Sequence, residues 1–171
     1  RPFLLLALGA LLYARTQAGG FVLDDQSAIR DNPIVQRGDL AEIFTTDYWA
    51  GFHHDRSGLY RPLTVWTFAL NHRLAGAEPF SYHLVNILLH GAVAALLYLV
   101  WRRCLGEEEL AWWAALLFAL HPVLSEAVAG LVGRADLLAA LFALLALHQH
   151  LGARPARWRH WGAGTALLAA L

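Results

Sequence analysis

Residues 83–101 form a 19-residue block that is almost wholly apolar. A helix rises about 1.5 Å per residue, so a block of this length matches the roughly 30 Å hydrocarbon core of a bilayer. Further apolar stretches occupy residues 111–124 and 127–150, and residues 161–171 begin another. Residues 1–14 are too short to cross alone. They are either the end of a first span, which we favour, or the tail of a signal peptide. The pattern therefore predicts several membrane crossings.

Composition supports this fold class. Hydrophobic residues make up 58% of the 171 residues, whereas soluble domains contain about 45–50%. The 13 arginines balance 13 acidic residues, and lysine is absent, so the overall charge predicts no nucleic-acid partner. We expect an all-α, multi-pass transmembrane helical bundle rather than a soluble domain.

Residues 15–82 form a polar loop between the first two predicted spans. Two short amphipathic stretches within it, at residues 39–48 and 63–74, are expected to be interfacial helices lying along the membrane surface. Short-loop arginines usually stay cytoplasmic. Arg1, the Arg102-Arg103 turn and the basic turn at residues 154–159 all fall on one side if the spans alternate. The long loop then lies outside, in the lumen or periplasm, and residues 121–136 approach the same face.

The adjacent pair Asp24-Asp25 is the sharpest chemical feature of this loop. Two neighbouring carboxylates near a surface of low dielectric constant repel each other, and desolvation raises their pKa values. One of them is then a plausible general base, able to take a proton from an acceptor hydroxyl. The alternative is a structural one, in which the pair forms the N-cap of a helix starting at Gln26. Both roles remain open.

Two arginines are candidate ligands for an anion. Arg134 lies in apolar surroundings near the outer face, and a buried guanidinium needs a partner. That partner is either a nearby carboxylate, Glu126 or Asp136, or the phosphate of a lipid, which arginine binds with two parallel hydrogen bonds. Arg61, directly before Pro62, is a second candidate for phosphate binding, with an ordinary surface arginine as the alternative.

Several polar residues within the apolar blocks are interpreted as supporting groups. His83, Asn86 and His90 share one helix face, where cross-helix hydrogen bonding is the favoured role. His121, before Pro122, is expected at the boundary between two helices. No metal site is predicted: the cluster at residues 53–55, His-His-Asp, is weak evidence for a metal.

The ordered set of short motifs resembles a known family, the transmembrane and tetratricopeptide-repeat O-mannosyltransferases. The resemblance covers about residues 20–150 and includes the following segments: Phe21-Val22-Leu23-Asp24-Asp25, Ala28-Ile29-Arg30-Asp31-Asn32-Pro33, Phe44, Asp47-Tyr48-Trp49, Tyr60-Arg61-Pro62-Leu63, Asn71, His83-Leu84-Val85-Asn86, His90, Phe118-Ala119-Leu120-His121-Pro122, Glu126-Ala127-Val128-Ala129 and Val132-Gly133-Arg134-Ala135-Asp136-Leu137-Leu138.

This resemblance implies a C-type membrane glycosyltransferase fold with an acidic motif in the first external loop. It implies inverting transfer of a sugar, mannose in animal members, from a polyprenyl phosphate such as dolichyl phosphate to a Ser or Thr hydroxyl of a protein. Asp24 and Asp25 match the acidic pair of the family, and Asp24 is preferred as the base. No cofactor is implied beyond the lipid-linked sugar, which is a substrate, and metal dependence is left open.

The resemblance also implies a location and a larger protein. The membrane would be that of the endoplasmic reticulum or the bacterial inner membrane, and the absence of lysine favours a bacterial relative. Tetratricopeptide repeats are expected beyond residue 171, and we expect the 171 residues alone to be inactive. Two other functions remain open: a transporter or proton relay that uses His83, His90, Arg134 and Glu126, and a non-catalytic membrane anchor for a repeat domain.

Overall fold

The computed structural model describes residues 1–51 and 58–152, and within these residues every regular element is a helix. The all-α class predicted from the sequence is confirmed. The elements are α1 (Pro2–Leu12), two short turns of helix (Ala14–Ala18 and Gln26–Arg30), α2 (Pro33–Arg37), α3 (Leu40–Thr45), α4 (Pro62–Ala75), α5 (Pro79–Leu105), α6 (Glu108–Leu120), the 3₁₀ turn Pro122–Leu124, α7 (Ser125–Ala129), the 3₁₀ turn Leu131–Gly133 and α8 (Arg134–His150).

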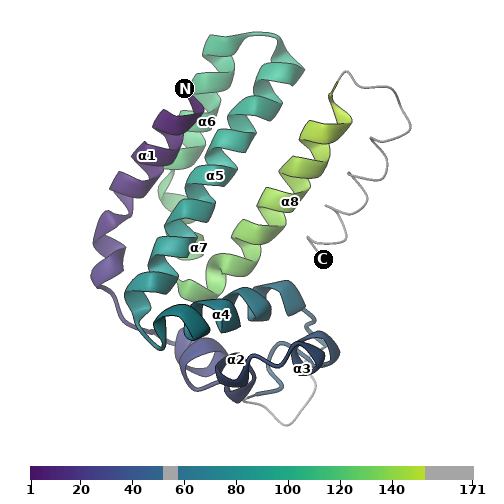
Figure 1. Ribbon diagram of the computed structural model, residues 1–171. Coiled ribbons are helices and arrows are strands. Elements are labelled where there is room, and N and C mark those ends of the chain that lie inside the picture. Colours follow the sequence, from purple (N-terminus) through teal and green to yellow (C-terminus); the bar gives the residue numbers. More distant parts are fainter. Residues whose placement is uncertain (52–57, 153–171) are drawn as a thin grey trace.

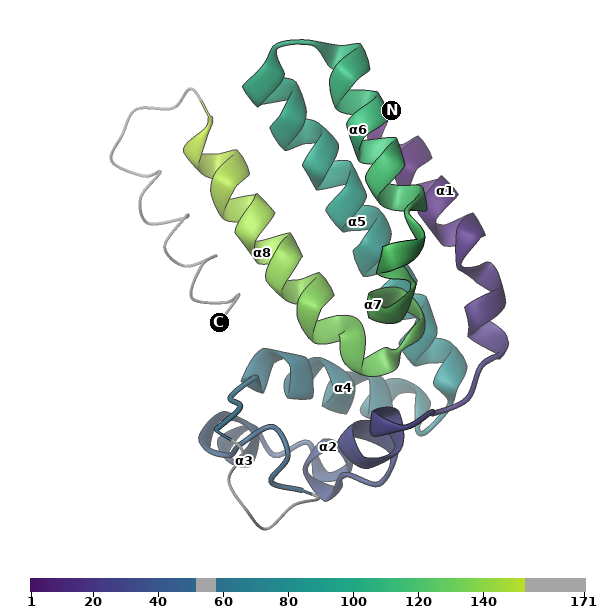
Figure 2. The ribbon, with the colours of Figure 1, turned by 180° about the vertical axis from the view of Figure 1, so that it is seen from behind.

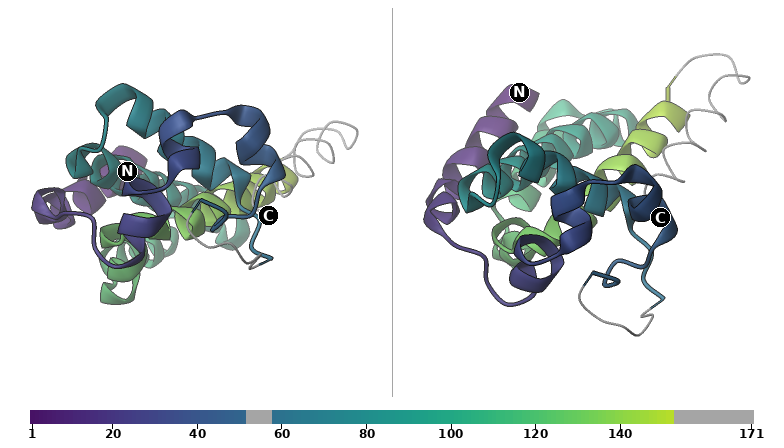
Figure 3. Two further views of the ribbon diagram at one scale, coloured as in Figure 1. Left: turned by 90° about the horizontal axis from the view of Figure 1, so that it is seen from below. Right: turned by 60° about the horizontal axis from the view of Figure 1, so that its bottom comes forward.

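The helices form an upright bundle with a cap at one end. α1, α5, α6 and α8 run side by side, and α2, α3 and α4 lie across the end of the bundle (Figure 1). The view from behind shows α7 tucked beneath α6 at that same end (Figure 2). Seen from below, the cap helices cover the ends of the upright helices (Figure 3). α5 is the central helix, because α1, α6 and α8 all pack against it.

Two helical segments are long and apolar enough to cross a bilayer, namely α5 and Leu131–His150, which contains α8. The predicted span 83–101 lies inside α5, which is longer at both ends. The predicted span 127–150 begins later, at residue 131. The predicted span 111–124 is not one straight helix: α6 ends at Leu120, and the pair Glu108–Leu120 and Pro122–Ala129 is bent by 50°. Counting that pair gives up to three spans in the part of the chain that is described.

The bend follows from the backbone at His121-Pro122. Proline at the first position of the next helical turn disfavours helical geometry in the residue before it, and His121 is accordingly extended (φ −71°, ψ 126°). The expectation that this pair separates two helices is confirmed. α1 is an apolar helix of only 11 residues, as expected for a segment too short to cross a bilayer alone. The expected span at residues 161–171, the basic turn at 154–159 and the cluster at 53–55 lie outside the described residues.

The cap helices have clear sequence signals. α2, α4 and α5 each have proline at the first helical position, and the Asn32 side chain accepts a hydrogen bond from the Ile34 N–H at 2.9 Å. The two predicted interfacial stretches correspond to α3 and α4. α2 was not predicted. A core beneath the cap, built largely from Ile29, Val35, Ile43, Phe68, Tyr82 and Leu131, fixes the cap to the start of α5 and to the turn before α8.

Candidate functional site

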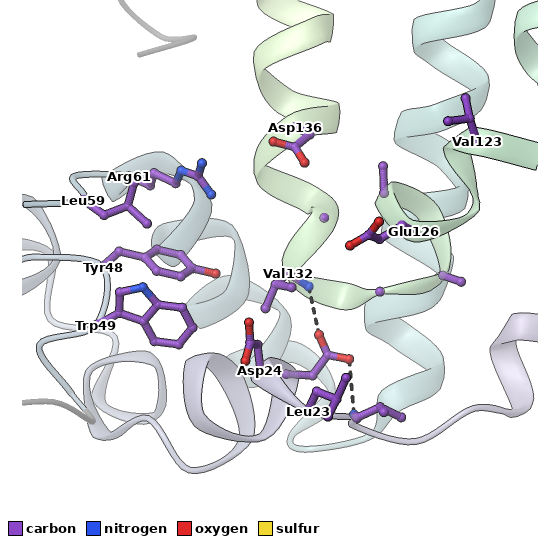
Figure 4. A pocket seen from close by; sticks show the side chains of 16 residues that line it. Leu23, Asp24, Tyr48, Trp49, Leu59, Arg61, Val123, Glu126, Val132 and Asp136 are labelled. Carbon is purple, nitrogen blue, oxygen red and sulfur yellow. Dashed lines mark hydrogen bonds between the residues drawn. The ribbon is translucent and has the colours of Figure 1, made fainter. Parts of the chain in front are cut away.

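A cavity of about 660 Å³ lies where the cap meets the α7–α8 junction. Its lining residues come from three parts of the chain: residues 22–25, a second group made of Tyr48, Trp49, Leu59 and Arg61, and eight residues between Val123 and Asp136. Figure 4 shows Tyr48, Trp49 and Arg61 on one wall, and Glu126 and Asp136 on the wall opposite. Asp24 lies between these walls (Figure 4). The cavity therefore combines carboxylates from two distant parts of the chain with one arginine among its lining residues.

Asp24 and Asp25 occupy different environments although they are neighbours. Asp24 is exposed at the cavity, whereas Asp25 is only 3% exposed. The Asp25 carboxylate accepts hydrogen bonds from the Val132 N–H at 2.9 Å and from the Val22 N–H at 3.3 Å. Asp25 thus ties the acidic loop to the turn before α8, more than 100 residues further along the chain.

The structure does not have the N-cap that was the alternative role for Asp24 and Asp25. Asp25 precedes the helical turn Gln26–Arg30, but its side chain caps none of that turn's N–H groups. Burial raises the pKa of Asp25 above its ordinary value, and the hydrogen bonds from Val132 and Val22 oppose that shift. Leu23, directly before the pair, has a positive φ of 50°, an unfavourable backbone conformation for a residue with a side chain.

Arg61 is half-buried and lines the cavity, at the residue before α4 begins. Its guanidinium carbon lies 5.9 Å from the centre of the Tyr48 ring, within the range of a cation–π contact. The structure therefore places this predicted phosphate ligand in the same cavity as Asp24.

Arg134 is placed differently from the prediction. Its side chain is fully buried and is not among the cavity-lining residues. The guanidinium donates to Asn86 Oδ1 at 2.9 Å, Asn71 Oδ1 at 2.8 Å, the Tyr82 carbonyl at 3.1 Å and the Thr67 carbonyl at 3.3 Å. It also lies 4.6 Å above the centre of the Phe68 ring.

These contacts correct the expectation that Arg134 pairs with Glu126, Asp136 or a lipid phosphate. Amide and carbonyl oxygens from α4 and α5 accept four hydrogen bonds from a group that carries five donors. Glu126 and Asp136 are instead exposed at the cavity. In this arrangement Arg134 joins α8 to α4 and α5 and has no free edge for a phosphate.

Asn86 extends this network toward the cavity. Its amide nitrogen donates to the carbonyls of Gly130 (3.1 Å) and Leu131 (3.3 Å). Asn86 therefore fixes the turn that presents the Val132 N–H to Asp25, and Arg134 in turn fixes the Asn86 side chain. The prediction that Asn86 bonds across helices is confirmed.

The three histidines predicted as supporting groups, His83, His90 and His121, do not line the cavity. His90 Nε2 lies 3.0 Å from the Ala119 carbonyl and joins α5 to α6, as predicted for a cross-helix contact. His83 is buried, and its ring nitrogens have no hydrogen-bond partner within residues 1–51 and 58–152. His121 is exposed, and its Nδ1 accepts a hydrogen bond from the Val123 N–H at 3.2 Å. No group of three or more potential metal ligands occurs among the residues that the structure describes.

Two site residues were missed by sequence reasoning. Val132 donates its backbone N–H to Asp25, a role that its apolar side chain does not indicate in the sequence. Tyr48 was read as part of an amphipathic stretch, yet it is 4% exposed, lines the cavity and belongs to the Asp47-Tyr48-Trp49 motif. Its place in that motif was the sequence signal that could have marked Tyr48 as a candidate site residue.

The fold and the cavity together define an all-helical membrane protein with an acidic site at one end of its candidate spans. Residues 57–171 match the family profile of dolichyl-phosphate-mannose-protein mannosyltransferases, which covers most of the chain. The chain therefore belongs to the family of dolichyl-phosphate-mannose-protein mannosyltransferases, and it is similar to the TMTC protein O-mannosyl-transferases. The resemblance drawn from the motifs is confirmed.

Three similar curated proteins come from a mouse, a human and a fly. The chain is 42% identical to the protein O-mannosyl-transferase TMTC2 of Mus musculus, over 95% of this chain and 20% of that protein. It is 47% identical to TMTC1 of Homo sapiens over 84% of this chain and 17% of that protein. It is 42% identical to Tmtc1 of Drosophila melanogaster over 82% of this chain and 17% of that protein. The chain thus spans about a fifth of the length of these relatives. No solved structure matches it significantly.

Proposed function

We propose that this chain forms part of the active site of a protein O-mannosyltransferase that uses a polyprenyl-phosphate sugar, with mannose as the sugar. The acceptor is a Ser or Thr hydroxyl on the lumenal or periplasmic side of the membrane. The observation that carries the proposal is the shared cavity, in which the exposed Asp24 and Arg61 face one volume at the end of the candidate spans. A lipid-linked donor would have its phosphate and sugar at the membrane edge, which is where the ends of membrane spans lie.

Asp24 is the proposed general base. It is the exposed member of the acidic pair and accepts the proton of the acceptor hydroxyl as the oxygen attacks C1 of the sugar. The new C1–O bond forms on the face opposite the departing group, while the bond between C1 and the phosphate oxygen breaks and polyprenyl phosphate leaves. Arg61 stabilises the charge that builds on that phosphate. Asp25, already bonded to two backbone N–H groups, positions the loop instead of taking the proton.

The test is Asp24→Asn in the full-length protein, with mannose transfer from a polyprenyl-phosphate donor to a Ser/Thr peptide as the readout. Loss of a general base lowers kcat by about 10²- to 10⁴-fold. The matched control is Asp31→Asn, because Asp31 is exposed, pairs with Arg30 at 2.7 Å and does not line the cavity. We expect the control to keep wild-type activity.

The other two functions make different predictions for the same variants. A membrane anchor tolerates Asp24→Asn, and a proton relay is most sensitive at His83 and His90. Wild-type kcat in Asp24→Asn, with transfer intact, excludes Asp24 as the base.

A further inference from the structure

The Tyr48 hydroxyl is a buried polar group without a partner. The Tyr48 side chain is 4% exposed, and its oxygen has no hydrogen-bond partner in the described part of the chain. Buried polar groups are almost always hydrogen-bonded, so an unpartnered hydroxyl beside a cavity points to a ligand that completes it. Figure 4 shows the hydroxyl directed from its own wall toward the wall that carries Val132 and Asp136.

The hydroxyl is held firmly in this position. The Tyr48 backbone N–H donates to the Leu59 carbonyl at 2.7 Å, which joins Tyr48 to the chain two residues before Arg61. The Tyr48 ring packs edge-on against Trp49, with their ring centres 5.0 Å apart. The Arg61 guanidinium lies over the same ring at 5.9 Å from its centre. A hydroxyl donor and a positive charge therefore share one wall of the cavity.

We propose that Tyr48 and Arg61 together form the phosphate subsite of this cavity, with the Tyr48 hydroxyl donating to a non-bridging phosphate oxygen of the polyprenyl-phosphate donor. This inference rests on the proposed function and adds a binding residue to it. The phosphodiester carries one negative charge, which Arg61 balances, and its oxygens are acceptors for both groups.

Two further observations favour this arrangement. Burial raises the pKa of Tyr48 far above its ordinary value, so the phenol stays protonated and remains a donor at neutral pH. Glu126 and Asp136 lie on the wall opposite Tyr48 and Arg61, and Asp24 lies between the two walls, so the positive charge of Arg61 attracts an anion to its own wall (Figure 4). A phosphate on that wall would leave the sugar to occupy the space beside Asp24.

The test is Tyr48→Phe in the full-length protein, which removes one oxygen and keeps the ring. We expect the KM for polyprenyl-phosphate mannose to rise about tenfold or more, the cost of losing one hydrogen bond to a charged group. Inhibition by polyprenyl phosphate, which lacks the sugar, weakens by the same factor. The melting temperature stays equal or rises, because the hydroxyl that is removed has no partner in the protein.

The matched control is Tyr60→Phe. The Tyr60 hydroxyl is exposed and donates to the Phe44 carbonyl at 2.8 Å, outside the cavity lining. Its loss leaves KM and inhibition unchanged. As a second variant, Arg61→Gln weakens polyprenyl-phosphate binding, and its effect in combination with Tyr48→Phe is less than the product of the two separate effects, because both groups bind one phosphate.

Failure of this inference is distinct from failure of the proposed function. An unchanged donor KM in an active Tyr48→Phe enzyme overturns the subsite and leaves the transferase intact. A raised KM for the sugar donor with unchanged inhibition by polyprenyl phosphate would mean that the hydroxyl binds the sugar. That outcome also overturns the phosphate subsite. If the wild type transfers no sugar, direct binding of polyprenyl phosphate, followed by tryptophan fluorescence, decides the subsite: equal affinity in wild type and Tyr48→Phe overturns it.

Discussion

Arg134 is a buried cation that is stabilised without a carboxylate. Its charge is spread over a planar fork, and amide and carbonyl oxygens of Asn86, Asn71, Tyr82 and Thr67 take its hydrogen bonds. The Phe68 and Tyr82 rings lie at cation–π distance on the same group. Because these acceptors belong to α4 and α5, one side chain fixes the cap helix α4 to α5 and α8 of the bundle.

This geometry makes Arg134→Lys a severe substitution although the charge is kept. An ammonium has three donors on one nitrogen and cannot reproduce the four hydrogen bonds that the guanidinium makes from three nitrogens, so buried acceptors lose their donors. We expect a loss of about 3 kcal/mol in the free energy of unfolding, measured by denaturation in detergent. Arg73→Lys, at an exposed position on α4, is the control and should be near neutral. If Arg134→Lys kept full stability but weakened polyprenyl-phosphate binding, the result would support the prediction from the sequence that Arg134 binds the phosphate.

At the scale of elements, the turn Leu131–Gly133 links the bundle to the acidic loop. It presents the Val132 N–H to Asp25, while its neighbouring carbonyls accept from Asn86. This turn packs so tightly on α7 that a Cβ atom at Gly133 would lie 2.4 Å from the Ala127 carbonyl oxygen. Only glycine fits there without displacing backbone.

Gly133→Ala is therefore expected to shift the turn and weaken the Asp25 contact. Overpacking against rigid backbone costs about 1–3 kcal/mol of stability, and transferase activity should fall with it because Asp24 adjoins Asp25. The melting temperature and the transfer rate of the full-length protein measure the two effects. Gly20→Ala serves as the control, since a Cβ at Gly20 meets nothing within 4 Å. Equal melting temperatures for the two variants would contradict the packing argument.

Elements with a strong local signal could be predicted, and those set by packing could not. The long apolar run predicts α5, and proline with glycine marks the limits of α4. α2 is only five residues long, and the Asn32-Pro33 pair before it is as typical of a turn as of a capped helix start. The span predicted at residues 111–124 did not include the bend after Leu120, because hydropathy carries no information on the direction of the backbone.

The same division applies to the site. Asp24, Arg61, Glu126 and Asp136 were singled out by residue type, and the structure brings them to one cavity. The side-chain directions were not predictable. Arg134 has Glu126 and Asp136 near it in sequence, yet it turns to Asn71 on α4, 63 residues away. Choosing between those partners requires knowing which helices pack together, and that depends on contacts far apart in the chain.

At the scale of the whole molecule, the two ends of the bundle carry different chemistry. Arg1 pairs with Glu108 and Glu109, and Arg103 donates to the His148 carbonyl, so the start of α1, the α5–α6 turn and the end of α8 meet at one end. The cavity and the cap lie at the other end (Figures 1 and 4). Arginine-rich short turns favour the cytoplasm, and this separation gives the bundle a polarity.

Cys104 offers a direct test of that polarity. It is exposed in the last turn of α5 beside Arg102 and Arg103, whereas Gln36 is exposed on α2 in the cap. In full-length protein otherwise free of cysteine, we expect a membrane-impermeant maleimide to label Cys104 only from the cytoplasmic side. A Gln36→Cys variant that also carries Cys104→Ser should be labelled only from the lumenal or periplasmic side. Labelling of both positions from one side would mean that the cap and the arginine turn share a compartment. Asp24 and Arg61 would then have no membrane between them and the arginine-rich end, contrary to the proposed sidedness of transfer.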